Sequence, residues 1–345
     1  MGKKILVTGA TGYIGSHTVV ELQQSGYQVI AVDDLSNSTE KIMDLVSKIS
    51  GRRPFFEKLD LSDEPAIRAF FAEHSDISGV IHFAAFKAVG ESVEFPLKYY
   101  RNNLFGLINL LNCMQEHHIG HLVFSSSCTV YGEPDKLPVN EKAPVKKALS
   151  PYGNTKQISE EIIEDTCGVS DLKAISLRYF NPIGAHESGL IGELPIGVPN
   201  NLVPFITQTA IGKRSKLKVF GQDYNTPDGT CIRDYIHVTD LAKAHVVAVK
   251  RMLENQGESR YEIFNLGTGK GYSVLETIKA FEKVSKVKLN YEITERRPGD
   301  VPKVWADTTY ANLKLGWKAE KGLEEMMASA WKWEKNLASG ILEQI

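Results

Sequence analysis

The sequence predicts an α/β protein with a doubly wound parallel sheet and a second, smaller α/β lobe. Short apolar runs rich in β-branched residues alternate with helical patterns over the first half of the chain. Because these runs are apolar throughout, we expect strands covered on both faces, as in a parallel sheet between two layers of helices. Ligands bind such sheets beyond the carboxyl ends of the strands, and small or polar residues follow several of these runs.

Six strands are expected in the first part of the chain, at residues 4–8, 28–32, 55–61, 79–85, 121–127 and 173–181. A loop rich in Gly and Pro, residues 182–201, then leads into a less regular second part. The predicted division is therefore a first domain at 1–181 and a second lobe at 182–345. Strands near 232–238 and 261–267 are expected to return to the first domain, and a helix is expected around 323–338.

Composition indicates a globular protein and excludes several classes of function. The chain has 345 residues, a formal net charge of −2 and no long basic run, which disfavours nucleic-acid binding. No apolar stretch approaches the ~18 residues that a membrane span needs. The cysteines Cys113, Cys128, Cys167 and Cys231 fit no zinc or disulfide spacing, so we expect reduced thiols, no metal site and a cytoplasmic location.

A glycine turn near the start of the chain predicts a dinucleotide site. Gly9, Gly12 and Gly15 follow the first strand and open a helix, so the backbone can approach a pyrophosphate at the helix N-terminus. Asp33 ends the second strand, where a carboxylate accepts hydrogen bonds from a ribose diol and repels a 2′-phosphate. The pattern favours NAD over NADP in a Rossmann-type domain; the alternative is a turn that only packs the helix on the sheet.

A second glycine cluster, Gly267-Thr268-Gly269-Lys270-Gly271, also follows a predicted strand. It lacks the Gly-Lys-Ser/Thr ending of a phosphate-binding loop, so we interpret it as a turn.

Hydroxyl groups and a Tyr-Lys pair are the catalytic candidates. The strand at 121–127 ends in Ser125-Ser126-Ser127, at the expected ligand edge of the sheet. The heptapeptide at 150–156, SPYGNTK, begins a predicted helix with Ser150 as cap and places Tyr152 and Lys156 on one face. Such a pair is common by chance, and the glycine turn with Asp33 makes it more specific.

These motifs together resemble the UDP-hexose 4-epimerases of the extended short-chain dehydrogenase/reductase family. The resemblance covers the whole chain and rests on TGATGYIGSH, VDDLSNS, HFAAFKAVGES, FSSSCTVYGE, SPYGNTK, LRYFNPIGAH, GVPNNLVP, DGTCIRDYIHV and RRPGDV. It implies the reversible interconversion of UDP-glucose and UDP-galactose. Hydride passes from C4 to tightly bound NAD, the 4-keto sugar turns over, and hydride returns to its other face.

The resemblance implies three catalytic residues. Tyr152 takes the proton of the sugar 4-hydroxyl, Lys156 holds the nicotinamide ribose and lowers the pKa of the phenol, and Ser127 hydrogen-bonds the 4-oxygen. A phenol held near neutral pKa by nearby cations is what proton abstraction requires.

The resemblance also implies two larger sets of binding residues. The cofactor set comprises Gly9, Gly12, Tyr13, Ile14, Gly15, Asp33, Asp34, Asn37, Ser38, Asp60, Leu61, Phe83, Ala84, Ala85, Lys87, Asn102, Ser125, Tyr152, Lys156 and Tyr179. The UDP-hexose set comprises Lys87, Ser127, Thr129, Tyr152, Phe180, Asn181, Asn201, Leu202, Val219, Phe220, Arg233, Tyr235, Arg297, Asp300 and Val304. Core packing is the rival interpretation for Phe220 and Tyr235.

Some positions depart from the family pattern. Asp34 stands where Asn is common, and Ala85 replaces a frequent Gly. Val304 occupies a position where bulky aromatic residues restrict the pocket to plain hexoses, so its smaller side chain suggests that UDP-N-acetylglucosamine and UDP-N-acetylgalactosamine are substrates too.

Three other functions compete with this hypothesis. A 4,6-dehydratase of the same superfamily needs an Asp-Glu pair after the catalytic hydroxyl, whereas Val130 and Tyr131 follow Thr129 here. An epimerase of another UDP-sugar, such as UDP-glucuronate, is harder to separate by sequence. A non-catalytic NAD-binding protein is disfavoured because Tyr152 and Lys156 are both present. Family resemblance further implies a homodimer that pairs through segments near 97–117 and 152–166.

Overall fold

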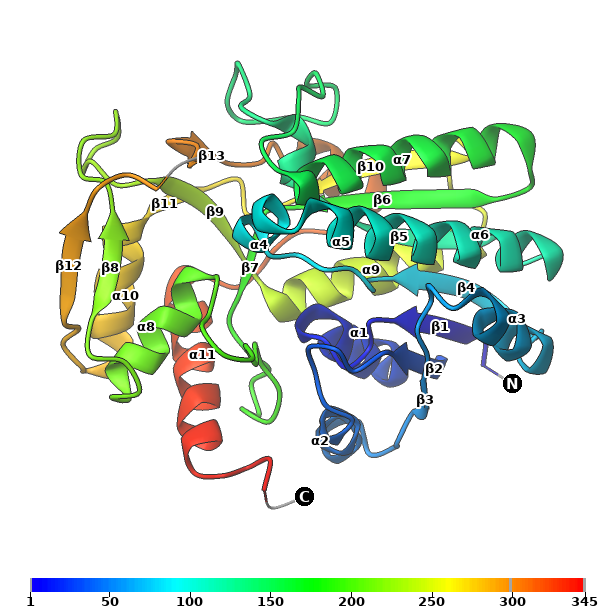
Figure 1. Ribbon diagram of the computed structural model, residues 1–345, viewed down its shortest axis with the longest axis horizontal. Coiled ribbons are helices and arrows are strands. Elements are labelled where there is room, and N and C mark those ends of the chain that lie inside the picture. Colours follow the sequence, from blue (N-terminus) through cyan, green and yellow to red (C-terminus); the bar gives the residue numbers. More distant parts are fainter. Residues whose placement is uncertain (1, 298–299, 344–345) are drawn as a thin grey trace.

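Within residues 2–297 and 300–343, which the computed structural model describes, the largest element is a seven-stranded sheet (Figure 1). Its strand order is β10-β6-β5-β4-β1-β2-β3, and every neighbouring pair is parallel. The strands are β1 (Lys4–Thr8), β2 (Gln28–Asp33), β3 (Phe55–Lys58), β4 (Ile77–His82), β5 (His121–Ser127), β6 (Lys173–Tyr179) and β10 (Tyr261–Leu266). The first strand lies near the middle and the chain winds outward in both directions, which confirms the predicted doubly wound sheet.

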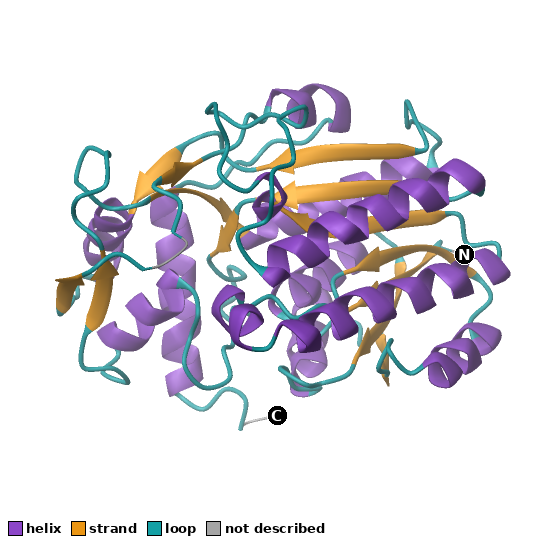
Figure 2. Cartoon of the chain, turned by 45° about the horizontal axis from the view of Figure 1, so that its top comes forward, coloured by secondary structure: helices purple, strands orange, loops and turns teal. Residues whose placement is uncertain are grey.

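Helices cover both faces of this sheet (Figure 2). One apolar core joins the strands to α1 (Tyr13–Gln24), α2 (Lys41–Ser50) and α9 (Val238–Leu253). The opposite core joins them to α3 (Glu64–Glu73), α6 (Gly106–Glu116) and α7 (Pro151–Val169). The continuous apolar strands of the sequence are therefore explained, because the inner strands β1, β4 and β5 bury side chains on both faces, whereas the edge strand β3 is largely exposed.

Short helices and helical turns follow β4 and β5, at the carboxyl ends of these strands. After β4 the chain forms α4 (Val89–Glu94), α5 (Pro96–Tyr100) and a π-helical turn, η1 (Arg101–Phe105). After β5 it forms a 3₁₀ turn, η2 (Cys128–Tyr131). A second π-helical turn, η3 (Ala311–Leu315), packs on α9 and β10.

The second part of the chain forms smaller sheets with their own core. Strand β9 (Ile232–His237) pairs with β7 (Asn181–Ile183), β11 (Gly271–Ser273) and β13 (Lys303–Val304). Strands β8 (Leu217–Phe220) and β12 (Tyr291–Thr294) form a separate parallel pair. A third apolar core joins β7, β8, β9 and β11 to the three helices α8 (Leu202–Ala210), α10 (Val274–Ser285) and α11 (Leu323–Ala338).

The two strands expected to return to the first domain behave differently. Strand β10 joins the main sheet beside β6, whereas β9 lies in the smaller sheet. The helix between them, α9, packs against α1 on the main sheet. The chain thus passes repeatedly between the two parts, and the division at residue 181 stays a proposal.

Candidate active site

The glycine turn after β1 is held tight by its surroundings. Gly9 has a φ of 67°, and a Cβ placed on it would lie 2.8 Å from the Ala84 nitrogen. A Cβ on Gly15 would lie 2.2 Å from the Gly9 carbonyl oxygen. Gly12 then caps α1 with extended backbone. These contacts require glycine at the first and third positions, and they bring the loop after β4 against the start of the helix.

Asp33 lies beside this turn, as the sequence predicts. Its side chain is buried and accepts hydrogen bonds from the backbone N–H of Thr11 at 3.1 Å and of Leu35 at 3.0 Å. The Ser38 hydroxyl donates to the same carboxylate at 3.2 Å. Burial raises the pKa of Asp33, and the hydrogen bonds from Thr11 and Leu35 oppose that shift. The carboxylate is therefore fixed at the end of β2, next to the helix N-terminus.

Ser127 and Tyr152 come together from two different elements. Ser127 ends β5, and its hydroxyl accepts from the Thr129 N–H at 3.2 Å. The Ser150 hydroxyl accepts from the Gly153 N–H at 3.1 Å, which caps α7 and places Tyr152 in its first turn. Burial raises the pKa of Tyr152 to about 12, and the neighbouring Ser127 hydroxyl opposes that shift.

Lys156 is buried one turn further along α7. Its ammonium donates to the Ser125 carbonyl oxygen at 2.7 Å and lies 4.8 Å from the centroid of the Phe124 ring. Burial lowers the pKa of Lys156 to about 8, and the Glu160 carboxylate opposes that shift. In this geometry the ammonium is anchored on β5, so a direct action of Lys156 on the pKa of the phenol stays a prediction.

The remaining cofactor candidates differ in their contacts and in their exposure. Tyr13 donates to the Gly184 carbonyl oxygen at 2.6 Å, and the Lys87 ammonium forms an ion pair with Glu193 at 3.1 Å. Asn102 donates to Asn103 at 3.0 Å, and the Tyr179 and Ser125 hydroxyls are hydrogen-bonded. The partly buried candidates are Ile14, Asp34, Ser38, Phe83, Ala84 and Ala85, Leu61 is buried in a core, and Asn37 and Asp60 are exposed.

Charged candidates for the diphosphate meet around one carboxylate. Asp300 accepts from the Arg297 guanidinium at 2.7 Å, and the Arg233 guanidinium lies 3.7 Å from the same oxygen. The Arg297 guanidinium lies 5.7 Å from the centroid of the Phe220 ring. The motif RRPGDV therefore folds into a basic corner, although its residues 298–299 lie outside the described part of the chain.

The other sugar-side candidates divide between the ligand edge and the core. Val304 is 9% exposed and packs in one apolar cluster with Val130, Tyr131 and Phe180. Val219 and Tyr235 are buried in the third core, which supports packing for those two side chains, while Phe220 is 37% exposed. Asn181 and Leu202 are partly buried and Asn201 is exposed. The Thr129 hydroxyl is buried without a partner among the described residues, which leaves it available to a ligand.

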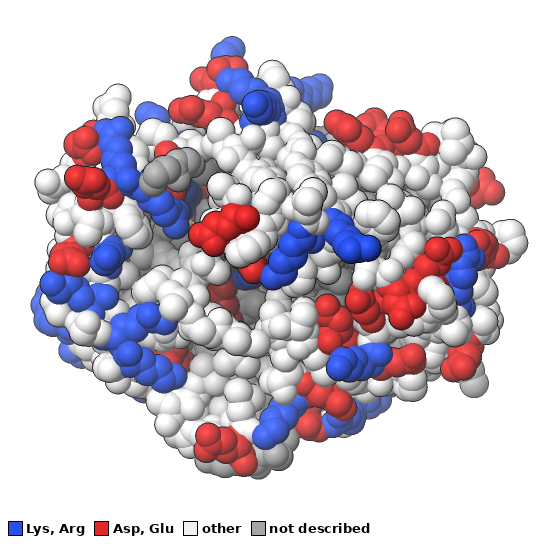
Figure 3. Space-filling view, in the orientation of Figure 1, with Lys and Arg blue, Asp and Glu red and all other residues white. Residues whose placement is uncertain are grey.

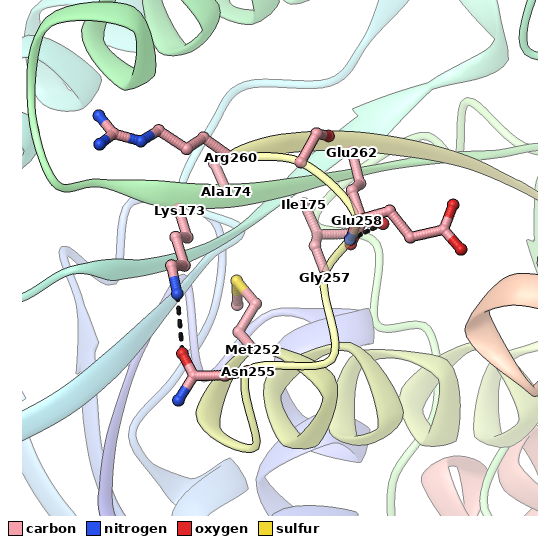
Figure 4. Close-up of a pocket in the computed structure, with 10 residues that line it drawn as sticks. Lys173, Ala174, Ile175, Met252, Asn255, Gly257, Glu258, Arg260 and Glu262 are labelled. Carbon is pink, nitrogen blue, oxygen red and sulfur yellow. Dashed lines mark hydrogen bonds between the residues drawn. The ribbon is translucent and has the colours of Figure 1, made fainter.

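Figure 3 shows acidic and basic side chains interspersed over one face, with a hollow between the part that carries the main sheet and the part that carries β8 and β12. Two cavities lie elsewhere. One, of about 210 Å³, lies where β6 and β10 begin and is lined by residues such as Lys173, Asn255 and Arg260 (Figure 4). The other, of about 460 Å³, is bordered by α1, α9 and α11. Residues outside the predicted sets line both.

Two supporting residues escaped the sequence analysis. Asn103 donates to the Phe86 carbonyl oxygen at 3.1 Å and to the Thr155 hydroxyl at 3.1 Å, so it ties the loop after β4 to the start of α7. Asp234 accepts from the backbone N–H of Thr268 at 2.8 Å and of Gly269 at 3.0 Å. The second glycine cluster is therefore a turn wrapped around the Asp234 carboxylate. For Asn103, the only signal in the sequence was its position next to Asn102.

Within the described ranges, no helix is long and apolar enough to cross a membrane. The same residues contain no group of three or more His, Cys, Asp or Glu side chains placed to hold a metal ion.

Comparison with known proteins gives close matches over nearly the whole chain. A family model described as GDP-mannose 4,6 dehydratase matches residues 6–330. The UDP-glucose 4-epimerase of Bacillus subtilis (strain 168) is 50% identical over 337 residues, which cover 97% of this chain and 98% of that protein. That of Drosophila melanogaster is 49% identical over 344 residues, 97% of each chain.

Solved structures agree with this assignment. The UDP-glucose 4-epimerase from Bifidobacterium longum, in complex with NAD+ and UDP, has a TM-score of 0.93 and 44% identity and covers 98% of this chain and 100% of its own. The enzyme from Stenotrophomonas maltophila, with bound NAD and formylated UDP-arabinopyranose, has a TM-score of 0.94 and 46% identity, with 98% and 99% covered. The chain belongs to the UDP-glucose 4-epimerase family, within the extended short-chain dehydrogenase/reductases.

Proposed function

We propose that this protein interconverts UDP-glucose and UDP-galactose at sugar C4, with NAD held throughout turnover. The observation that carries the proposal is the meeting of Ser127, at the end of β5, with Tyr152, in the first turn of α7, at the sheet edge where the glycine turn and Asp33 also lie. A proton acceptor and a dinucleotide cradle at one edge suit oxidation of a secondary alcohol.

The glycine turn fits NAD. The turn leaves no room for Cβ atoms at Gly9 and Gly15, so its backbone can lie against a pyrophosphate, and Asp33 is placed for the adenine ribose diol. When bound, NAD supplies hydride chemistry by accepting a hydride from sugar C4 and returning it.

The chain's own residues hold the sugar and move its proton. Tyr152 takes the proton of the 4-hydroxyl, and the neighbouring Ser127 hydroxyl holds the oxygen and relays the proton to the phenol. Since burial raises the pKa of this phenol to about 12, a cation brought beside it would favour the phenolate. Arg233 and Arg297 would bind the diphosphate, with Asp300 turning toward the uridine ribose, because guanidinium groups form strong charge-assisted hydrogen bonds with phosphate oxygens and both groups lie near Asp300.

Incubation of the purified protein with UDP-galactose, without added NAD, tests the proposal. Proton NMR should show UDP-glucose accumulating to a fixed ratio, and the same ratio should be reached from UDP-glucose. UDP-glucuronate in a parallel incubation tests the competing epimerase, and absence of interconversion of any UDP-sugar would favour the non-catalytic alternative.

We also propose that the sugar pocket accepts 2-acetamido sugars. Val304 packs with Tyr131 and Phe180 through an aliphatic side chain, where a ring would fill more space. UDP-N-acetylglucosamine should therefore be epimerised. Val304→Tyr should reduce that activity at least about tenfold relative to the activity on UDP-glucose, since a small difference in fit changes the activation free energy by ~1–3 kcal/mol. An unchanged ratio in the variant would contradict the proposal.

A homodimer is the proposed assembly. Leu97, Phe105 and Ile108 are 80%, 55% and 40% exposed along α5, η1 and α6, and α5 packs beside α7. A second copy would cover this apolar surface. Analytical ultracentrifugation should give the mass of two chains, and Leu97→Asp should lower the fraction of dimer; a monomer at all concentrations would exclude this assembly.

We propose a cytoplasmic location. Each of the four cysteines is a free thiol, as expected in a reducing compartment. Cell fractionation with an antibody to the protein would test this.

A further inference from the structure

A buried ion pair, Arg178–Glu160, contacts the strand end next to Ser127 through the Ser126 hydroxyl. The Arg178 Nε donates to Oε1 of Glu160 at 2.9 Å, and its Nη2 donates to Oε2. Both side chains are almost fully buried, at 4% and 8% exposure. Burying two charges is costly unless hydrogen bonds satisfy them, and a hydrophobic pair would often be as stable. The pair therefore calls for a reason beyond packing.

Glu160 occupies a specific place relative to Lys156. Tyr152, Lys156 and Glu160 follow one another at intervals of four along one face of α7. The Ser126 hydroxyl donates to Oε1 of Glu160, and Ser126 lies between Ser125, whose carbonyl holds Lys156, and Ser127. The carboxylate thus contacts the same strand end that anchors the Lys156 ammonium.

Arg178 joins the carboxylate to the turn behind the catalytic hydroxyls. Its guanidinium lies 4.8 Å from the centroid of the Tyr131 ring, at the end of η2. The Tyr131 hydroxyl donates to Asn265 at 2.7 Å, and Asn265 donates to the Val139 carbonyl oxygen at 2.9 Å. A chain of polar contacts therefore runs from α7 through β6 to the turn that carries Thr129.

The charged and titratable groups around Lys156 come from three elements. They are Tyr152 and Glu160 on α7, His82 on β4, and Arg178 and Tyr179 on β6. Burial lowers the pKa of His82 to about 3, so that ring is neutral, and both phenols have raised pKa values, also through burial. Glu160 is therefore the anion that opposes the cost of a buried ammonium at Lys156.

We propose that Glu160 and Arg178 are positioning residues for Lys156: the Glu160 carboxylate keeps the buried ammonium charged, and Arg178 fixes that carboxylate against β5 and η2. The proposal rests on the function proposed above, in which Lys156 acts as a cation beside the nicotinamide ribose.

The pH profile of the NAD-loaded enzyme tests this role. Rates of UDP-galactose conversion would be measured from about pH 6 to 10 for the parent and for Glu160→Gln. Removing the carboxylate lowers the pKa of Lys156, so the basic limb should move to lower pH by about half a unit or more. The double variant Glu160→Gln/Arg178→Met also removes the guanidinium that would be left without its carboxylate, so it should show a smaller shift in the same direction.

A matched control lies near the start of β10. Arg251 and Glu262 form an equally buried ion pair beside the cavity of Figure 4, with an Nη2–Oε1 distance of 2.8 Å. Glu262→Gln should lower stability and leave the basic limb in place. A basic limb unmoved in the double variant, or moved equally in Glu262→Gln, would overturn the proposal.

A second measurement separates failure of this proposal from failure of the proposed function. The pH dependence of NAD release, followed by cofactor fluorescence, needs no sugar substrate. As the pH is raised, the rate of NAD release should begin to increase at a lower pH in Glu160→Gln and in the double variant than in the parent. Equal profiles would count against the pair even if the parent converts no UDP-sugar.

Discussion

The Tyr13 hydroxyl donates to the Gly184 carbonyl oxygen at 2.6 Å, and this contact joins the first turn of α1 to the loop that follows β7. The two residues are 171 positions apart. The bond therefore ties the glycine turn to the part of the chain proposed to hold the UDP-sugar.

Tyr13→Phe removes this tie while keeping the ring. Loss of the donor should lower the free energy of unfolding by about 1–2 kcal/mol, because the Gly184 carbonyl loses its partner in a buried place. Urea denaturation of the parent and the variant would measure the difference. A variant as stable as the parent would mean that water replaces the phenol.

Gly15→Ala should abolish the dinucleotide cradle. The added Cβ would lie 2.2 Å from the Gly9 carbonyl oxygen, so the turn must open. The purified variant should contain little NAD, measured by release after denaturation. Gly168→Ala is the matched control, since Gly168 lies in α7 with open space at its Cβ position. That change should keep NAD content and add about 0.5–1 kcal/mol of stability.

Tyr152→Phe should reduce turnover by about 10²–10⁴-fold, the range for loss of a positioned base. The ring and its packing remain, so NAD content should match the parent. Steady-state rates and NAD release would be measured on the same preparation. Turnover close to that of the parent would remove Tyr152 from the role of base.

Acid should destabilise the protein through buried neutral histidines. Burial lowers the pKa of both His17 and His82 to about 3. The unfolded chain then binds more protons than the folded chain between about pH 3 and 6.5, so stability falls as pH falls through 6.5. At pH 5 His82 alone should account for about 2 kcal/mol of this loss.

His82→Asn would check the attribution, because Asn retains a polar partner for the Thr8 hydroxyl, which lies 2.8 Å from the His82 ring nitrogen. The difference in unfolding free energy between pH 7 and pH 5 should shrink by that amount. An equally steep dependence in the variant would assign the acid sensitivity to other groups.

The main sheet could be predicted because most of its strands are mainly apolar and end in small or polar residues. Ser150 likewise predicts the start of α7, and its hydroxyl accepts the capping hydrogen bond from the Gly153 N–H. The partner sheet of the segment at 232–238 could not be predicted, because alternation of apolar residues says nothing about which strands will pair. In the structure this strand, β9, pairs with β7, β11 and β13.

Contacts between distant polar residues were also beyond the sequence. The spacing of Tyr152 and Lys156 predicts a shared helix face, but the Ser125 carbonyl that receives the ammonium lies on another strand. Glu160 continues the same spacing, yet its partner Arg178 comes from β6. A buried charge can be recognised as functional only once its partner is known.

The place of β10 at the edge of the main sheet also bears on synthesis. Residues 261–266 pair along β6, so the parallel sheet that begins at residue 4 is incomplete until residue 266 has left the ribosome. Until then β6 presents an unpaired, buried-type edge, which is prone to wrong association. Nascent chains that stop before β10 should depend on chaperones, and neither part of this protein should be obtainable as a stable fragment by cutting the chain once.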